Sequence, residues 1–184
     1  MKKYDIIYAD PPWSYRNKNT GGSMKSGASA KYPTMSLEEI KNLPIKNISQ
    51  KNAVLFLWVT VPLLPEGIQV LQQWGFKYKT MLTWRKIMSL GLGFWFRGQT
   101  EHILMGVKGN VKAFRIQKAN FYQCKSMRHS QKPQFFRDLI SEAAKKTFGE
   151  EAKMLEMFAR DSDEMDFEGW DKYGNQVADS IIIS

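Results

Sequence analysis

The sequence predicts an α/β fold in which a mainly parallel sheet carries helices on both faces. Short apolar runs alternate with amphipathic helical patterns along the chain, as expected for strands joined by crossover helices. The run Ala53–Thr60 is continuously apolar, which is typical of a strand covered on both faces. With 184 residues, 43% of them hydrophobic, we expect a single domain over residues 1–184.

The first predicted strand, Asp5–Ala9, is rich in β-branched and aromatic residues. Further apolar runs predict four more strands and, with less regular patterning, a last one at the carboxyl-terminal end. These strands are expected at residues 53–60, 78–86, 101–109, 154–158 and around 167–173.

Helix signals lie between these runs. Ser36 and Glu39 form a capping-box pattern before a short helix that stops at Pro44. Pro65 suits the first turn of a second helix that Gly75 ends, and Pro133 begins a strong amphipathic helix that ends by Gly149. The Gly/Ser/Lys-rich segment 17–34 predicts a loop.

The formal net charge of +9 is unevenly distributed. No acid occurs from Ser14 to Leu37 or from His102 to Phe136, although both segments contain several Lys and Arg residues. Solvated faces usually mix both signs, so these segments predict contact with a polyanion; lysines that serve only solubility are the alternative. The residues expected to contact this polyanion are Arg16, Lys18, Lys112, Arg115 and Lys118.

Cysteine and histidine content limits the possible chemistry. The single cysteine, Cys124, excludes an intramolecular disulfide and suits the reducing cytoplasm, where we expect the protein to be located. Only two histidines accompany it, so no metal site is expected. No stretch is long and apolar enough to span a bilayer, which predicts no membrane partner.

The stretch YDIIYADPPWSY ends an apolar strand with an acid, two prolines and an indole. Pro11 and Pro12 cannot continue a ladder and stiffen the exit, so Asp10 and Trp13 are held rigidly. In an open α/β sheet, ligands bind at this end of the strands. The alternative is an ordinary strand exit, with Asp10 as turn former and Trp13 as core cover.

The residue types of this exit suit methylation of an aromatic amine. The lone pair of such an amine is delocalised into the ring, and acceptors for both N–H groups would free it. The Asp10 carboxylate and the Pro11 carbonyl can supply these acceptors, and the Trp13 ring could stack on an extruded base. Proline stiffness would preserve the line of attack.

Asp10-Pro11-Pro12-Trp13 matches the signature of the adenine-N(6) amino-methyltransferases. The whole chain resembles the messenger-RNA adenosine methyltransferase family and its prokaryotic and phage relatives. Four further blocks follow in family order: Glu101–Asn110, Ser130–Pro133, Leu155–Arg160 and Gly169–Gln176.

This resemblance implies a Rossmann-like, circularly permuted fold, in which the catalytic block precedes the cofactor block, and S-adenosylmethionine as methyl donor. By position, Lys132 would meet the donor's carboxylate and Asp10 its amino group. Arg160, Asn175 and Gln176 would hold its ribose and adenine, and Asp5 and Ile6 would lie against the adenine ring. The segment FARDSDEM lacks the glycine-rich loop of many amino-methyltransferases, as in the messenger-RNA type.

The resemblance favours an enzyme that methylates adenine in nucleic acid. DNA is expected rather than RNA, since no recognition domain is appended and compact members resemble phage and prokaryotic DNA enzymes. An inactive nucleic-acid-binding subunit is a second hypothesis, against which the intact Asp10–Trp13 motif argues. A third is methylation of cytosine or of a small molecule. A homodimer or a partner methyltransferase subunit stays open.

Overall fold

The computed structural model describes residues 2–14, 33–87, 95–125, 131–160 and 166–183. Within these ranges seven strands form one sheet in the order β5-β3-β4-β2-β1-β6-β7. β4 runs antiparallel to its neighbours β2 and β3, and the other four pairings are parallel, which confirms the mainly parallel sheet. The strands are β1 (Tyr4–Ala9), β2 (Ser49–Thr60), β3 (Lys77–Ile87), β4 (Thr100–Lys108), β5 (Phe121–Lys125), β6 (Met154–Met157) and β7 (Trp170–Tyr173).

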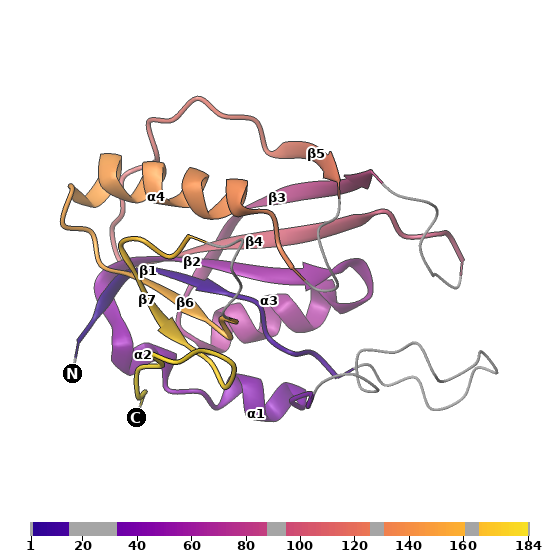
Figure 1. The fold of residues 1–184 in the computed structure, drawn as a ribbon, viewed down its shortest axis with the longest axis horizontal. Coiled ribbons are helices and arrows are strands. Elements are labelled where there is room, and N and C mark those ends of the chain that lie inside the picture. The colour runs from indigo at the N-terminus through magenta and orange to yellow at the C-terminus, as the bar shows by residue number, and fades with distance from the viewer. Residues whose placement is uncertain (1, 15–32, 88–94, 126–130, 161–165, 184) are drawn as a thin grey trace.

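Helices cover both faces of the sheet (Figure 1). On one face lie the short helices α1 (Leu37–Lys41) and α2 (Ile45–Ile48), the 3₁₀ turn η3 (Val61–Leu63) and α3 (Leu64–Gln73). The long helix α4 (Gln134–Phe148) covers the other face alone among the described elements. The α/β fold is therefore as predicted.

The apolar run of strand β1 is explained by burial on both faces of the sheet. Ile7 and Ala9 pack into the core shared with α1, α2 and α3, whereas Ile6 and Tyr8 pack into the core beneath α4. Successive side chains of a strand point to opposite faces, so a strand covered on both sides buries every residue.

The predicted helix boundaries agree closely with the structure. Ser36 and Glu39 form the full capping box of α1, with the Ser36 side chain accepting from the Glu39 N–H. Gly75 follows α3 with a φ of 87°, a left-handed conformation that favours glycine. Gly149 ends α4 with a φ of 94°.

Strand β5 was not predicted. It pairs with β3, with Thr83 opposite Phe121, and forms the edge of the sheet. Its alternating exposure lacks the buried run that marks the central strands. The chain reaches it by crossing the α4 side of the sheet after β4 ends (Figure 1).

The two ends of the strands define two edges of the molecule. The carboxyl edge holds the ends of β1, β2, β3 and β6 and the start of the antiparallel β4. The amino edge holds the starts of those parallel strands and the end of β4.

Candidate active site

The Asp10–Trp13 motif leaves β1 at the carboxyl edge, as predicted. Its backbone is fixed locally, because the Trp13 N–H donates to the Pro11 carbonyl over 2.8 Å. The Met35 N–H donates to the Pro12 carbonyl over 2.8 Å, which ties the motif to the chain before α1. A carbonyl has two lone pairs, so Pro11 retains capacity for a second donor.

Four charged side chains alternate in sign at this edge. The Lys132 ammonium lies 2.8 Å from Asp10 Oδ2 and 3.2 Å from Glu101 Oε2. Glu101 also forms an ion pair with Lys86. The side chains of Lys132 and Glu101 are only 15% and 16% exposed, so Lys132 is not a solvated helix-end residue. Its ammonium also lies 5.0 Å from the centre of the Trp58 ring.

Burial and charge act against each other in this cluster. Burial raises the pKa of Asp10, and the Lys132 ammonium opposes that rise only in part. Burial alone would also raise the pKa of Glu101, but Lys132 and Lys86 together outweigh it and lower that pKa. Burial would lower the pKa of Lys132, yet Asp10 and Glu101 raise it well above its ordinary value. Lys132 is therefore a permanent cation.

Trp13 lies in the core. Its side chain is 8% exposed, and its indole N–H donates to the Trp58 carbonyl over 3.0 Å. This placement fits the alternative of core cover, in which the ring anchors the motif. Among the described residues, Trp95 and Phe96 have almost fully exposed aromatic side chains, at 94% and 91%, on the connection from β3 to β4; sequence reasoning did not identify them.

Three predicted cofactor residues come together after β6 and β7. Arg160 and Gln176 form a parallel β-bridge, and the Ala159 N–H donates to the Tyr173 carbonyl over 3.0 Å. A Cβ on Gly174 would lie 2.3 Å from the Ala159 carbonyl oxygen, so only glycine permits this approach. Asn175 lies between Gly174 and Gln176 and is exposed.

The same segment lies close to the catalytic motif. β6 is the neighbour of β1 in the sheet, and the Arg160 guanidinium lowers the pKa of Asp10. The structure thus brings Asp10, Lys132, Arg160 and Gln176 to one edge from four distant parts of the sequence.

The placement of Asp5 and Ile6 contradicts their assignment to the donor's adenine. Ile6 is fully buried beneath α4 and has no surface to offer a ligand. The Asp5 carboxylate accepts from the Lys153 N–H over 2.9 Å at the amino edge. Five residues of extended chain, about 16 Å, separate Asp5 from Asp10.

Of the five predicted nucleic-acid residues, the three that the structure describes do not lie together beside the Asp10–Trp13 motif. Arg16 and Lys18 lie outside the described residues. Lys112 lines a pocket at the amino edge, and Lys118 lies 3.8 Å from Glu142 of α4. Arg115 is exposed on the segment between them. The acid-free stretch His102–Phe136 leaves β4 at the amino edge, opposite the Asp10–Trp13 motif, because the antiparallel β4 ends there.

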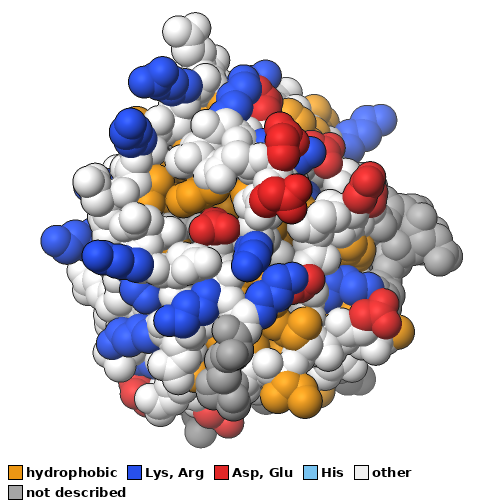
Figure 2. All heavy atoms as spheres, turned by 90° about the vertical axis from the view of Figure 1, so that its left-hand side faces the viewer, with side chains coloured by type: hydrophobic (Ala, Val, Ile, Leu, Met, Phe, Trp, Pro, Cys, Tyr) orange, Lys and Arg blue, Asp and Glu red, His pale blue; other side chains and the backbone are white. Residues whose placement is uncertain are grey.

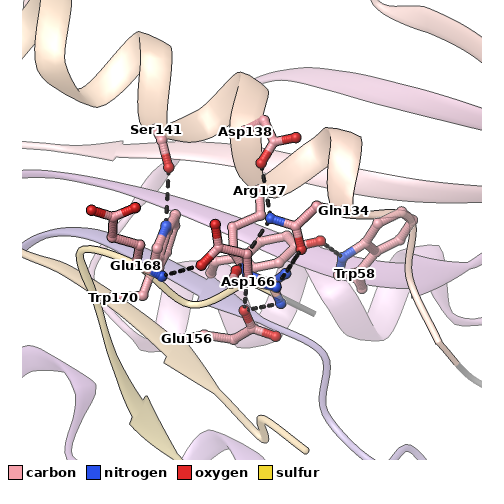
Figure 3. A network of polar contacts seen from close by, with 10 residues as sticks. Trp58, Gln134, Arg137, Asp138, Ser141, Glu156, Asp166, Glu168 and Trp170 are labelled. Atoms are coloured by element: carbon pink, nitrogen blue, oxygen red, sulfur yellow. Dashed lines mark hydrogen bonds and ion pairs between the residues drawn. The ribbon is translucent and has the colours of Figure 1, made fainter. Parts of the chain in front are cut away.

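A buried ion pair joins α4 to β6, the strand next to the one that carries Asp10. Arg137 of α4 is 2% exposed, and its Nε lies 2.7 Å from Glu156 Oε2 on β6. Figure 3 shows Arg137 and Gln134 reaching from α4 toward Glu156 and Asp166. Burial raises the pKa of Glu156, an effect that Arg137 opposes. The Asp10 carboxylate raises the pKa of Glu156 and the Lys132 ammonium lowers it, so the ion pair is coupled to the charges of the site.

Sequence reasoning missed Glu101, Arg137 and Glu156 as contributors. A signal existed for two of them, because Glu101 begins an apolar strand and Glu156 interrupts another. An ionised side chain inside a buried strand requires a partner. Arg137 carried no such signal, since a charged residue on an amphipathic helix is usually solvated.

The carboxyl edge offers suitable groups for S-adenosylmethionine, the methyl donor that the resemblance implies. Gln131, next to Lys132, has a buried Nε2 with no hydrogen-bond partner among the described residues. A buried hydrogen-bond donor without an acceptor is rare in folded proteins, and it suits a site in which a bound ligand provides the acceptor. Together with the Asp10 carboxylate and the Arg160–Gln176 bridge, it fits a ligand with amino, carboxylate and ribose groups.

A family model described as MT-A70 matches residues 4–176. The chain belongs to the MT-A70 family. The predicted family is therefore confirmed, and with it the enzyme class: the chain is an adenine N(6)-methyltransferase. Members of the MT-A70 family use S-adenosylmethionine.

Three relatives show the range of the family. Type II methyltransferase M.MunI from Mycoplasma sp is 34% identical over 198 residues, which cover 98% of this chain and 81% of that protein. A putative N(6)-adenosine-methyltransferase MT-A70-like from Medicago truncatula is 27% identical over 190 residues, all of this chain and 28% of the relative. The N6-adenosine-methyltransferase non-catalytic subunit MTB from Arabidopsis thaliana is 35% identical over 120 residues, 60% of this chain and 15% of the relative.

No cluster of three or more potential metal ligands occurs among the described residues. None of the helices in the described ranges is long and apolar enough to cross a membrane.

Proposed function

We propose that this methyltransferase acts on the N(6) amine of adenine in DNA, with Asp10 as the residue that contacts the amine. The carrying observation is the arrangement at the carboxyl edge, where a partly exposed Asp10 carboxylate is held 2.8 Å from the buried Lys132 ammonium. A DNA substrate is supported by the similarity to a type II methyltransferase, which covers 81% of that relative at 34% identity.

Asp10 and the Pro11 carbonyl are proposed to accept the two N–H groups of the target amine. Accepting both hydrogen bonds draws the nitrogen toward tetrahedral geometry and frees its lone pair. When bound, S-adenosylmethionine would supply an activated methyl group to that lone pair and leave as S-adenosylhomocysteine, while the methylated amine releases one of its N–H protons. The Trp13–Pro11 and Met35–Pro12 hydrogen bonds hold the backbone that carries the Pro11 carbonyl, and the Lys132 ion pair holds the Asp10 carboxylate, so little reorganisation is needed.

Lys132 is proposed to keep the Asp10 side chain ionised and correctly oriented. Burial would favour the neutral acid, which would lose one acceptor oxygen, and Lys132 opposes this. Glu101 shares Lys132, and Lys86 neutralises Glu101, so the chain of charges is balanced. Contact of Lys132 with the donor's carboxylate is proposed in addition.

Arg160, Asn175 and Gln176 are proposed to hold the ribose and adenine of the donor. Their support is their joint position after β6 and β7, next to the strand that carries Asp10. In this proposal the fold is Rossmann-like and circularly permuted, since the catalytic block precedes the cofactor block in the chain.

A non-catalytic role is the alternative, because one relative is named as a non-catalytic subunit. Incubation with isotopically labelled donor and separate DNA and RNA pools, followed by nucleoside mass spectrometry, separates the possibilities. Labelled N(6)-methyladenine in DNA is the expected product. Label found only in RNA would mean that RNA, and not DNA, is the substrate. No label in either pool would favour a non-catalytic subunit. Association with itself or with a partner subunit stays a prediction for sedimentation analysis.

A further inference from the structure

We propose that the amino edge carries a second binding region for the nucleic-acid backbone, separate from the carboxyl edge where methyl transfer takes place. Five lysines form this region, named here the amino-edge lysines: Lys3, Lys46, Lys51, Lys108 and Lys112. The inference rests on the proposed nucleic-acid substrate and adds a distinct site to it.

The five lysines come together because of the topology. Lys3 precedes β1, Lys46 lies on α2 just before β2, and Lys51 lies near the start of β2. Lys108 ends β4 and Lys112 follows it, because the antiparallel β4 brings its carboxyl end to this edge. Figure 2 views this side of the molecule and shows Lys and Arg side chains concentrated over one part of it, with most acids to the other side.

These lysines are not neutralised by the protein. No ion pair joins any of them to an acid among the described residues, whereas Lys41 and Lys118, for example, each lie near a glutamate. The Lys108 ammonium instead donates to the Lys46 carbonyl and to Ser49 Oγ. Burial, with the nearby charges of Lys3 and Lys46, lowers the pKa of Lys108, which shows that like charges face one another here.

A pocket with a volume of about 350 Å³ lies beside this cluster, and its lining combines polar side chains with the apolar Val111 and Phe148. Lys51 and Lys112 line it together with the amides of Gln50, Asn52 and Asn110. Asp5 is the acid in its lining, and its carboxylate accepts the Lys153 N–H. Two ammonium groups with several amide groups suit a phosphate oxygen, which accepts from both kinds of donor.

The wall of this pocket is rigidly built. Gly109 has a φ of 71°, and a Cβ there would lie 2.2 Å from the Lys51 carbonyl oxygen. Only glycine therefore allows the turn after β4 to approach β2 so closely. Asn52 Oδ1 accepts from the Asn110 N–H over 2.9 Å, which fixes the turn. Lys112 is held near Lys51 by this arrangement.

The region is too far from Asp10 to touch the same nucleotide. Ala9 pairs with Leu57, so Asp10 is level with Trp58, and seven residues of β2 separate that position from Lys51. At about 3.3 Å per residue the two edges lie about 23 Å apart. A duplex rises about 3.4 Å per base pair, so about seven base pairs separate the two contacts.

The test compares two double variants that remove the same charge. Lys51→Gln/Lys112→Gln changes the pocket, and Lys41→Gln/Lys146→Gln removes two lysines that form ion pairs with glutamates of α1 and α4. Binding of a 40-base-pair duplex is measured without methyl donor over a range of salt concentrations. The plot of log affinity against log salt should be less steep for the pocket variant. Its negative slope should be smaller in magnitude by about 1.8, which is about 0.9 per lost phosphate contact. The control variant should leave the slope unchanged.

A kinetic measurement then locates the effect. With genomic DNA free of adenine methylation, at moderate salt, the pocket variant should raise KM about tenfold and leave kcat unchanged. Equal salt slopes in the wild type and the pocket variant would overturn the proposal. So would a slope change in the control of the same size, or a loss of kcat with an unaltered slope. Calorimetric binding of inorganic phosphate with unaltered slopes would reassign the pocket to a small anion. Absence of methyl transfer in every variant would contradict the proposed function but leave the binding result interpretable.

Discussion

Asp10 combines two properties that rarely occur together, since it is partly exposed to the site and yet has a raised pKa from burial. The Lys132 ammonium at 2.8 Å keeps its charge available. A carboxylate held in this way accepts a hydrogen bond without reorganising, which is the property that a preorganised catalytic acceptor needs.

Replacing Asp10 by Asn should therefore reduce methyl transfer at least about 100-fold. The amide keeps the shape but loses the charge and turns one acceptor into a donor. Single-turnover transfer to DNA at saturating donor measures the effect, and Asp138→Asn on the exposed side of α4 is the matched control. Transfer within threefold of the wild type, in a folded Asp10→Asn protein, would contradict the assignment.

The pH dependence of transfer tests the role of Lys132. Asp10 must be ionised to act, and its raised pKa means that activity is lost on the acid side at a pH above the ordinary range for Asp. Lys132→Met removes the cation that opposes burial, so this acid limb should move to higher pH; Lys132→Arg should leave it near the wild-type position. A higher KM for the donor with an unmoved acid limb would show that Lys132 serves only the donor's carboxylate.

Trp13 should contribute to stability through its burial. Trp13→Ala removes a side chain that is 8% exposed and its hydrogen bond to Trp58, at a cost of about 3–5 kcal/mol. Urea unfolding followed by circular dichroism measures this loss. Trp95→Ala, at a side chain 94% exposed, should change stability by less than about 0.5 kcal/mol. A comparable cost at both positions would argue against Trp13 as an anchor.

At the scale of elements, α4 is joined to the sheet by the Arg137–Glu156 pair as well as by apolar packing. Arg137→Met leaves a buried carboxylate without its cation and should cost about 3–5 kcal/mol at neutral pH. Burial raises the folded-state pKa of Glu156, so its favourable contribution is present at acid pH and lost as pH rises through that pKa. Without Arg137 that pKa rises further.

The stability deficit of Arg137→Met should consequently shrink as the pH falls through the raised pKa of Glu156. Urea unfolding at each pH measures it against the wild type. Lys146→Met, which breaks the exposed pair with Glu142, is the control and should cost less than about 0.5 kcal/mol at every pH. A deficit that is independent of pH would mean that Arg137 acts by packing alone.

The elements that sequence reasoning predicted well are those with local signals. The continuous apolar runs of β1 and β2 and the capping box of Ser36 depend on neighbours in the sequence. β5 is an edge strand whose residues alternate in exposure, and its pairing with β3 depends on a partner about 40 residues away. Such pairings are decided by tertiary structure and leave little local trace.

The active site was partly predictable for the same reason. The Asp10–Trp13 motif is contiguous, so its rigidity could be read from two prolines. Asp5, although only five residues away, lies at the opposite edge, because an extended chain advances about 3.3 Å per residue. Lys112 was misplaced since the direction of β4, which decides the edge that follows it, has no signature in the sequence.

At the scale of the whole molecule, the two edges divide the charge. Opposite charges alternate at the carboxyl edge from Lys86 to Asp10, whereas no ion pair joins an amino-edge lysine to an acid among the described residues. Part of the net charge of +9 is thereby concentrated at a surface that raises the free energy of the folded state. A binding surface for a polyanion has this cost when its ligand is absent.

Relieving that repulsion should stabilise the protein. Lys3→Gln/Lys46→Gln removes the two charges that lower the pKa of Lys108, and at about 20 mM salt the variant should gain on the order of 1 kcal/mol in unfolding free energy. The gain should fade by about 0.5 M salt, where the Debye length is only a few ångströms. Urea unfolding at a series of sodium chloride concentrations measures both effects. Lys41→Gln/Lys118→Gln, which removes lysines that lie near glutamates, should show no gain at low salt. If both double variants gained equally, the repulsion would belong to the net charge of the molecule, and if neither gained, the amino-edge lysines would be too well solvated to repel one another.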